Sequence, residues 1–251
     1  MGFDKTVDWH ARFSQQARWT EGIRLYLFDR IGLASGQRML EVGCGTGAVL
    51  SGLVTKNCQV YGIDIDRGFL LQAQQNIPSA RLAQSDAHHL PYVDSSFDIT
   101  VCHYVLLWVA DPAHVVSEMR RVVRPGGWAL ALAEPDYGGR VDYPESLVQL
   151  GSIQEAALRR QGAETRLGRR LSSLFHSTGL QQIETGVLGG QWRLVPSEAD
   201  LAQEWEMLET DLAKEFTPGE LTRLRGLDTE AWTQGKRVLY VPTFYAVGKK
   251  L

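Results

Sequence analysis

Residues 40–47 read LEVGCGTG, and this stretch decides the fold, because three alternate glycines follow an apolar run and an acidic side chain. Gly43, Gly45 and Gly47 fall where a strand is expected to give way to a helix. Glycine permits a tight turn and lets backbone N–H groups approach a ligand, and a helix N-terminus carries partial positive charge. The stretch therefore predicts a site for a polar or anionic group of a nucleoside-type cofactor, with a purely structural turn as the competing interpretation.

The chain around this stretch alternates strand-length apolar runs with helical patterns, which is typical of an α/β fold with a parallel sheet. The apolar runs are RMLEV, QVYGI, ARLAQ, DITVC and ALALA. The clearest helical pattern covers residues 113–123, and residues 124–127 (RPGG) predict a helix stop followed by a turn. Strand–helix–strand units of this length imply right-handed crossovers.

Helical segments are expected on both sides of this core. Residues 8–33 form an aromatic-rich helical lead, and further helices are predicted over 147–160 and 167–178. QQIETGVL and VPTFYAVG are candidate strands with a mainly helical stretch between them. Within that stretch residues 201–212 carry an apolar stripe, interpreted as packing against the domain or, alternatively, as contact with substrate.

The domain organisation predicted from these patterns is a single domain over residues 1–251. Residues 1–33 are predicted to form a helical N-terminal lid. Residues 136–165 and 189–238 are predicted to be insertions on the substrate side of the sheet.

Composition restricts the class of partner. The chain has 26 basic and 29 acidic residues, a net charge of −3, which argues against electrostatic binding of nucleic acid. It contains no run of about 18 apolar residues that could span a membrane, and its N-terminus lacks the apolar segment of a secretory signal. Residues 1–6 fit the short myristoylation pattern, but no polybasic patch supplies a second anchor, so no stable membrane anchor is expected. Cys44, Cys58 and Cys102 form no CxxC pair, and we expect reduced thiols in a cytoplasmic protein.

The glycine pattern alone leaves two kinds of cofactor open. The spacing Gly43-x-Gly45-x-x-Ala48, with Asp64 about twenty residues further on, also fits a dinucleotide fingerprint. Glu41 favours the other interpretation, because its carboxylate would repel a pyrophosphate but could bind an ammonium group through a charge-assisted hydrogen bond. The residues thus favour a cofactor with an amino-acid moiety, and a nicotinamide-dependent dehydrogenase is the alternative.

Four motifs taken together resemble those of class I S-adenosylmethionine-dependent methyltransferases, in the small-molecule group that includes the ubiquinone and menaquinone methyltransferases. The motifs are LEVGCGTG, VYGIDID, QSDAHHLPYVDSSFDITVC and RRVVRPGGWALALAEPD. They cover residues 20–135 of the chain in outline. The resemblance implies an α/β, doubly wound, mostly parallel seven-stranded Rossmann-like sheet. It also implies the strand order 3-2-1-4-5-7-6, an antiparallel last strand and helical lid insertions.

The resemblance further implies that the first motif binds the amino-acid end of S-adenosylmethionine. Gly43, Cys44, Gly45 and Gly47 would cradle the methionine part and the ribose of this cofactor. Glu41 would orient the amino-acid end. In the helical lead, Arg18 is a candidate partner for the carboxylate of the cofactor.

The other motifs are implied to bind the nucleoside. Asp64 would accept both ribose hydroxyls, with Ile65 against the adenine. Asp86 would accept from the adenine amino group, Ala87 would offer its backbone N–H, and His103 would lie near the methionyl end. A carboxylate can accept two donors at once, and all these positions follow strands, where open α/β sheets bind ligands.

The catalytic residue is left open by the sequence. Methyl transfer needs an aligned nucleophile and a site that excludes water, and the cofactor carries the reactive group. The candidate bases are His103, His10 and Tyr137, and no spacing singles one of them out. For His103 a cofactor or packing contact is the alternative interpretation. Without an HExxH pattern or a Cys/His quartet, no metal is expected.

Candidate substrate-pocket residues come from two segments. Tyr137, Arg140 and Tyr143 directly follow the fifth predicted strand, and Trp19 lies in the helical lead, which folds either as a lid or as a surface helix. After the fourth strand, HYVLLW contains neither of the motifs that the resemblance predicts for enzymes that methylate nucleobases. A nucleic-acid substrate is therefore not expected.

These inferences lead to two hypotheses of function. The first is S-adenosylmethionine-dependent methyl transfer to a small, hydrophobic or aromatic metabolite at oxygen, carbon or nitrogen. The second is a catalytically silent S-adenosylmethionine-binding module that acts through a protein partner. The methyl acceptor, the pathway and the oligomeric state are left open by the sequence.

Overall fold

The structure, a computed structural model, describes residues 8–54, 56–187 and 196–251. The myristoylation pattern, the start of the predicted lid and residues 189–195 of the second predicted insertion lie outside the described residues. The described chain forms two compact units, which we call the sheet unit and the helical unit. The sheet unit comprises residues 8–134, 167–187 and 243–251, and the helical unit comprises residues 135–166 and 196–242.

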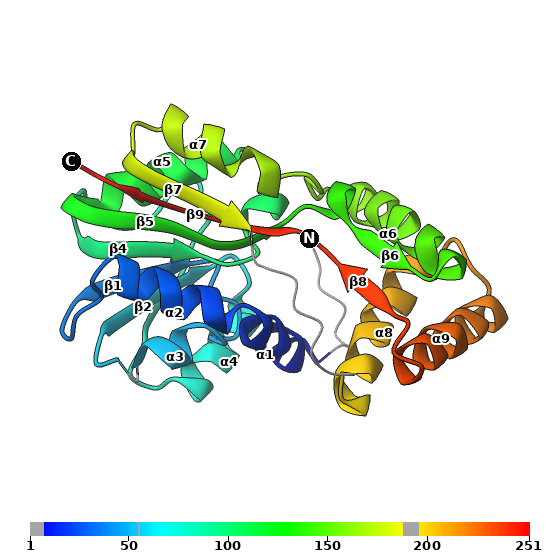
Figure 1. The fold of residues 1–251 in the computed structure, drawn as a ribbon. Coiled ribbons are helices and arrows are strands. Elements are labelled where there is room, and N and C mark those ends of the chain that lie inside the picture. Colours follow the sequence, from blue (N-terminus) through cyan, green and yellow to red (C-terminus); the bar gives the residue numbers. More distant parts are fainter. Residues whose placement is uncertain (1–7, 55, 188–195) are drawn as a thin grey trace. The chain divides into compact units, whose positions relative to one another are not determined.

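The sheet unit is built on seven strands in the order β3-β2-β1-β4-β5-β9-β7 (Figure 1). Strands β3, β2, β1, β4 and β5 pair in parallel, and β7 pairs antiparallel with β9. Two short strands belong to the helical unit. Without them this is the predicted order 3-2-1-4-5-7-6, which is confirmed. The bounds are β1 Arg38–Val42, β2 Gln59–Asp64, β3 Arg81–Gln84, β4 Phe97–Cys102, β5 Val123–Pro135, β7 Gln181–Val187 and β9 Thr243–Lys249.

Strand β1 is central because it pairs on both sides. Leu40 lies opposite Tyr61 of β2 and Thr100 of β4. A parallel strand covered on both faces has few exposed positions, which explains the apolar runs of the sequence. Because parallel strands end at the same edge of a sheet, the segments that follow β1, β2, β3 and β4 lie along one edge.

Helices cover the sheet unit, and the predicted helical lead is confirmed as two of them. They are α1 Trp9–Trp19, α2 Glu21–Arg30, α3 Leu50–Val54, α4 Arg67–Asn76, α5 Pro112–Val122 and α7 Leu171–Ser177, with short 3-10 turns η1 Leu106–Trp108 and η4 Gly168–Arg170. Helix α5 begins as its sequence suggests. Pro112 occupies its first turn, and Asp111 Oδ1 accepts a hydrogen bond from the His114 N–H at 3.0 Å.

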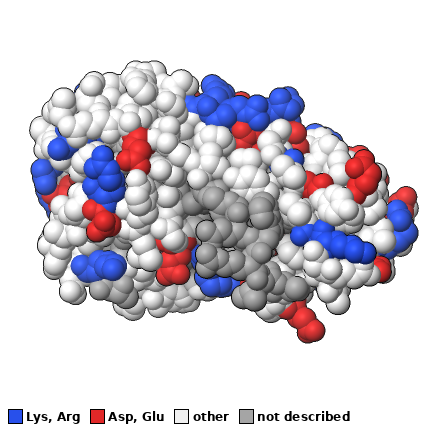
Figure 2. All heavy atoms as spheres, in the orientation of Figure 1, with Lys and Arg blue, Asp and Glu red and all other residues white. Residues whose placement is uncertain are grey.

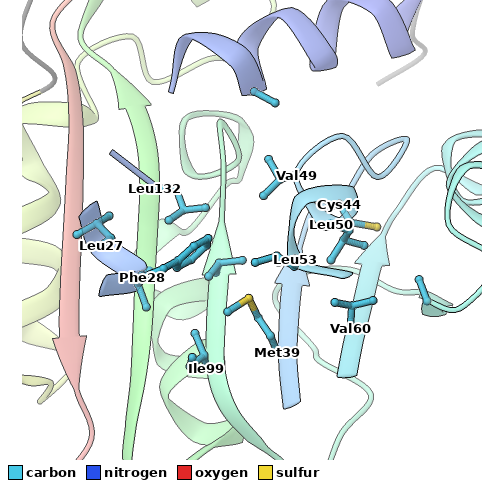
Figure 3. Packing of buried hydrophobic residues seen from close by; sticks show 14 of the residues in the cluster. Leu27, Phe28, Met39, Cys44, Val49, Leu50, Leu53, Val60, Ile99 and Leu132 are labelled. Carbon is cyan, nitrogen blue, oxygen red and sulfur yellow. The ribbon is translucent and has the colours of Figure 1, made fainter. Parts of the chain in front are cut away.

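A large hydrophobic cluster packs helices against the sheet. Figure 3 shows Leu27 and Phe28 of α2 beside Met39 of β1 and Ile99 of β4, with Leu50 of α3 in the same cluster. The apolar stripe of α5 is also completely buried: Val115, Val116, Met119 and Val122 have no exposed surface. The sheet is thus rigidly supported below the edge at which its strands end.

The predicted turn at residues 124–127 is wrong in detail, because these residues lie within β5. Val123 pairs with Phe97, Trp128 pairs with Ile99, and the register shifts between the two pairs. Gly126 has a φ of +78° and supplies the left-handed conformation that the irregularity needs. The local turn signal was real, because pairing with β4 is interrupted there and resumes at Trp128.

The helical unit has its own core. Its elements are η2 Tyr137–Gly139, β6 Val141–Tyr143, η3 Glu145–Leu147, α6 Val148–Arg160, α8 Glu198–Leu212, α9 Pro218–Thr233 and β8 Val238–Tyr240, with β6 antiparallel to β8. Trp205, Leu208 and Leu212 of α8 are buried with Leu150 of α6 and Leu224 of α9. The apolar stripe of residues 201–212 is therefore packing, as the first interpretation held. Among the described residues, no helix is both long and apolar enough to cross a bilayer.

Candidate cofactor site

The glycine stretch forms a loop, residues 43–49, between the end of β1 and the start of α3, so the glycines lie between a strand and a helix as predicted. Three N–H groups of the loop donate to other groups of the protein. The Gly45 N–H donates to Asp64 Oδ2 at 2.8 Å, and the Gly47 N–H donates to the carbonyl of Cys44 at 2.9 Å. The Cys44 N–H donates to the main chain of β2. The loop is thereby fixed to the end of β2.

The three predicted glycines are required by backbone conformation and by close packing. Gly43, Gly45 and Gly47 have φ values of +71°, +50° and +84°, which side-chain-bearing residues rarely adopt. A Cβ on Gly43 would lie 2.5 Å from Val105 Cγ2, and a Cβ on Gly45 would lie 2.9 Å from Phe13 Cε2. Val105 and Phe13 therefore leave no room for a side chain at Gly43 or Gly45.

The Cys44 side chain points into the core, where its sulfur lies among the apolar side chains of the large cluster (Figure 3). A Cβ on Gly62 of β2 would lie 2.8 Å from this sulfur. Burial raises the pKa of the Cys44 thiol far above its ordinary value. Only the backbone of Cys44 is therefore placed to take part in a cradle.

Helix α1 lies on the glycine loop. His10 Nδ1 is 2.8 Å from Thr46 Oγ1, and the Asn76 side-chain amide donates to the Thr46 carbonyl at 3.0 Å. Phe13 packs edge-on against Phe69 of α4, with ring centroids 5.3 Å apart. The structure thus brings His10 to the glycine loop, and its role as a base stays a prediction.

Glu41, near the end of β1, is the most informative residue of the site. Its side chain is 2 % exposed, and Oε2 has no hydrogen-bond partner among the described residues. Burial raises the pKa of this carboxyl well above its ordinary value, against the opposing effect of the Arg24 charge. An unpaired buried oxygen costs free energy unless a donor reaches it. An ammonium group is the donor that would satisfy it best, so the residues present fit a cofactor with an amino-acid end.

Asp64 and Ile65 follow one another at the end of β2. Asp64 Oδ2 accepts from Gly45, and Oδ1 accepts from the Asp66 N–H at 2.9 Å. Each carboxylate oxygen can accept a further hydrogen bond, so Asp64 retains the capacity to receive two hydroxyls. Ile65 is 65 % exposed. An apolar ligand surface at the end of β2 would cover it.

Asp86 and Ala87 follow β3. Asp86 Oδ1 accepts from the His88 N–H at 2.9 Å and lies 2.7 Å from His88 Nδ1. These bonds lower the pKa of Asp86, so it is an ionised, exposed acceptor. Ala87 is half-buried beside it. The geometry leaves Asp86 suited to accept from an amino group, and the assignment of both residues stays a prediction.

His103 directly follows β4. Its Nε2 lies 2.8 Å from Thr20 Oγ1, at the junction of α1 and α2. Burial and the charge of Arg24 lower the pKa of His103 to about 3. A base with so low a pKa is neutral at physiological pH but removes a proton inefficiently. The geometry therefore favours a packing or cofactor contact for His103 over general-base catalysis.

We expect the His103 imidazole to stay neutral from pH 8 down to pH 5, because a pKa of about 3 puts its protonation below this range. The check is a ¹H–¹⁵N spectrum of the imidazole nitrogens recorded across this range, with the His103→Gln variant used to assign the signal. An imidazole that instead titrates near its ordinary pKa would show that the site is open to water.

Glu134 is a residue of this region that sequence reasoning missed. It lies at the end of β5 with no exposed surface, and its carboxylate accepts three backbone N–H bonds, from Val105, Leu106 and Leu107 at 3.0, 3.0 and 3.2 Å. Burial raises its pKa to about 7, although the three bonds oppose this shift. Glu134 thereby fixes the segment after His103. In the sequence, the position of Glu134 is marked only by the fact that it is an acidic residue directly after an apolar run.

The two lead residues predicted to reach the ligand are exposed. Arg18 is exposed near the end of α1, and Trp19 is 52 % exposed with the Arg12 guanidinium 5.2 Å from its ring centroid. The cation whose charge acts on Glu41 is instead Arg24 of α2. Sequence reasoning missed Arg24, because a helical segment does not reveal which of its arginines faces inward.

Three candidates lie in the helical unit, and one of them has a structural role. The Arg140 side chain is 4 % exposed and donates from Nε and Nη2 to Asp142, at 2.6 and 3.1 Å, and from Nη1 to Gln154. This geometry argues against the predicted contact of Arg140 with substrate, because all three nitrogens are engaged within the unit. Tyr143 is 55 % exposed and Tyr137 is half-buried, and their roles stay predictions.

Comparison with known proteins places this geometry in context. A family described as a methyltransferase domain matches residues 40–131. Demethylmenaquinone methyltransferase of Bacillus mycoides is 30 % identical over 170 residues, which are 59 % of this chain and 72 % of that protein. Demethylmenaquinone methyltransferase of Renibacterium salmoninarum is 33 % identical over 139 residues, which are 54 % of this chain and 56 % of that protein. Among the first curated relatives, the matched part spans about half of their length.

A solved structure shares the fold over most of the chain. It is the phosphoethanolamine N-methyltransferase 2 of Haemonchus contortus in complex with S-adenosyl-L-methionine. The TM-score is 0.59 at 20 % identity, and the match covers 90 % of this chain and 51 % of that one. At this identity the likeness establishes the fold and leaves the substrate to chemical argument.

Proposed function

The chain belongs to the class I S-adenosylmethionine-dependent methyltransferases, and we propose that it transfers a methyl group to a small, hydrophobic or aromatic metabolite. The observation that carries this proposal is the unpaired Oε2 of buried Glu41 beside a loop of three left-handed glycines. Asp64 lies on the neighbouring strand, with its carboxylate already on that loop. An amino-acid group joined to a ribose matches this pair of acids.

The cofactor is S-adenosylmethionine, which when bound supplies a methyl group on a positively charged sulfur. In this proposal Glu41 receives the ammonium group of its amino-acid end. Asp64 accepts the ribose hydroxyls, Ile65 covers the adenine, and Asp86 accepts from the adenine amino group. Each of these residues lies on the edge where the parallel strands end.

The methyl acceptor in this proposal is one whose nucleophilic atom does not need to be deprotonated by a strong base of the protein. His103, the histidine nearest the end of β4, is held neutral with a pKa of about 3. An acidic phenol or enol, or an unprotonated amine, can act as nucleophile without a strong base beside it. This supports an aromatic or otherwise apolar acceptor over an aliphatic alcohol.

Surface charge supports a small-molecule acceptor over a nucleic acid. On the face that Figure 2 shows, basic and acidic side chains are scattered among uncharged ones, and the chain as a whole has a net charge of −3. A nucleic-acid-binding face would concentrate lysine and arginine. Cys44, Cys58 and Cys102 are free thiols, which suits a reducing compartment, and we place the reaction in the cytoplasm.

The test of the proposed function has two parts. Isothermal titration with S-adenosylmethionine and S-adenosylhomocysteine is expected to show one shared site, with no competing heat from NADH. Transfer of a labelled methyl group is then measured against a panel of phenols, quinols and amines. Absence of binding would remove the proposal, and binding without transfer to any acceptor of the panel would favour a silent binding module.

We expect cofactor binding to release a proton from Glu41. Burial raises the pKa of this carboxyl in the free chain, and a ligand ammonium beside it would lower that pKa again. Between the two pKa values the ligand-bound state therefore holds fewer protons, so affinity increases with pH, by at most about tenfold per pH unit.

The measurement is calorimetry from pH 5 to pH 7 in buffers of different ionisation enthalpy, a range that lies above the ordinary pKa of a glutamate and below that of an α-amino group, about 7.7–8.0. The Glu41→Gln variant is the matched control, since it keeps the size of the side chain and cannot release a proton. Equal heats in all buffers for the unaltered chain would contradict the assigned contact.

A further inference from the structure

Arg24 of α2 is a cation at the junction of α1 and α2 with no role in the contacts assigned so far. Its Nη1 donates to Thr20 Oγ1 at 2.7 Å and to the carbonyl of Ala17, at the junction of α1 and α2. Thr20 Oγ1 in turn lies 2.8 Å from Nε2 of His103. The guanidinium group is thus two hydrogen bonds away from the residue that follows β4.

Arg24 lies near a buried acid with which it does not pair. Thr20, to which Arg24 donates, lies against His103. His103 is two residues after Val101, the residue opposite Glu41 in the sheet. The charge of Arg24 acts on Glu41, near the end of β1, and on His103. Within the described part of the chain, Arg24 has no carboxylate at ion-pair distance, and Glu41 Oε2 has no hydrogen-bond partner. Glu21, one turn earlier on α2, also acts on Arg24 through its charge.

In the free chain the Arg24 guanidinium lacks an acid partner among the described residues, and burial favours the protonated form of the Glu41 carboxyl, so neither group is compensated in its charged form. A zwitterionic α-amino-acid group would compensate both at once, with its ammonium on the acid and its carboxylate on the guanidinium. Arginine suits this task, since its planar fork can donate two parallel bonds to a carboxylate. Nη1 of Arg24 is held by Thr20 and Ala17, which orients the fork in advance.

We propose that Arg24 receives the α-carboxylate of the bound cofactor, opposite Glu41, and that Thr20 positions Arg24 for this contact. The inference rests on the proposed function and assigns a residue to one group of its cofactor. It replaces the expectation that Arg18, which is exposed on α1, would make this contact.

The test compares two ligands that differ only in the carboxylate: S-adenosylmethionine and its decarboxylated form. For the unaltered chain, titration is expected to show tighter binding of the complete ligand. For Arg24→Gln, affinity for S-adenosylmethionine is expected to fall by about tenfold or more, whereas affinity for the decarboxylated ligand changes by less than about threefold. Arg24→Lys keeps the charge and should recover part of the preference.

Arg18→Gln is the matched control and should behave as the unaltered chain with both ligands. If Arg24→Gln weakens both ligands equally, the residue only supports the α1–α2 junction and the inference is overturned. It is also overturned if Arg18→Gln, and not Arg24→Gln, abolishes the preference. An unaltered chain that binds neither ligand would instead overturn the proposed function itself, together with this assignment.

Discussion

Replacing Asp64 with alanine is expected to weaken the binding of S-adenosylhomocysteine by roughly 100-fold or more. The reason is that each hydrogen bond between a hydroxyl and an ionised carboxylate contributes about 1.5–3 kcal/mol, and a ribose diol makes two of them. The substitution also removes the acceptor of the Gly45 N–H, so the glycine loop loses its attachment to β2. Both consequences lower affinity. Isothermal titration is the measurement.

Two control variants separate the hydrogen bonds of Asp64 to the ribose hydroxyls from its hydrogen bond to the glycine loop. Asp64→Asn keeps one oxygen for the Gly45 N–H and should lose less affinity than the alanine variant. Asp66→Ala removes the cap of α4, where Asp66 Oδ1 accepts from Gly68 and Phe69 at 2.7 and 3.2 Å. It should lower stability by about 1 kcal/mol and leave affinity within about threefold.

The 2′-deoxyribose analogue of S-adenosylhomocysteine serves as a further control, measured with the unaltered chain and with Asp64→Ala. Because it lacks one of the two hydroxyls, its affinity should depend much less on Asp64. If Asp64→Ala bound S-adenosylhomocysteine as tightly as the unaltered chain, the second strand would not hold the sugar, and the assignment of this edge of the sheet would have to be abandoned.

The existence of the core strands could be predicted because apolar runs of strand length alternate with helical patterns, whereas their order was implied by the resemblance of the motifs to a family. Buried parallel strands leave this signal in any sequence that forms them. Strands β6 and β8 of the helical unit were not predicted. Each has three residues, too few for a period of two to be recognised, and they pair across a long stretch of chain. At residues 124–127 the sequence has a strong turn signal, and the pairing with β4 is interrupted there, although these residues still belong to β5.

The candidate site was predictable where a residue follows a strand and less so where it lies on a helix. Glu41 and Asp64 are placed by β1 and β2, and the motifs mark them. Arg18 and Arg24 are separated by a helix break at Thr20, and only the bonds of Arg24 to Thr20 and of Thr20 to His103 show that Arg24 is the one beside the edge where β4 ends. Local patterns cannot reveal such a choice, because the partners come from distant parts of the chain.

Arg140 is a further residue whose role depends on partners from distant parts of the chain. Its partner Asp142 is the basis of the second prediction with a large expected effect. Asp142 lies between two arginines in the helical unit: its Oδ1 accepts from Arg237 Nη2 at 2.7 Å, and Oδ2 accepts from Arg140 Nε at 2.6 Å. Arg237 Nε also donates to Asp228 Oδ1 at 2.6 Å, and the Trp205 indole donates to Asp228 Oδ2 at 2.9 Å. The side chains of Arg140, Asp142 and Arg237 are at most 4 % exposed. The position of Arg140 after β5 predicted a contact with substrate, whereas in the structure its guanidinium shares the Asp142 carboxylate with Arg237.

We expect Asp142→Ala to destabilise the helical unit by about 3–5 kcal/mol, because it leaves two buried guanidinium groups with one acid fewer. Denaturant unfolding is the measurement. Glu215→Ala in the same unit breaks the ion pair of Arg160 with Glu215, which is 2.6 Å long but 50 % and 39 % exposed, and should cost less than about 1 kcal/mol.

A double variant, Arg140→Met with Asp142→Leu, tests the physical reason for this effect. Apolar side chains of similar size need no partner, and Arg237 keeps the Asp228 carboxylate, so part of the lost stability should return although Arg237 Nη2 has lost its acceptor. If Asp142→Ala unfolded at the same denaturant concentration as the unaltered chain, Arg140 and Arg237 would have to reach water or another acid. Arg140 would then become a candidate for substrate binding again, as its position after β5 first suggested.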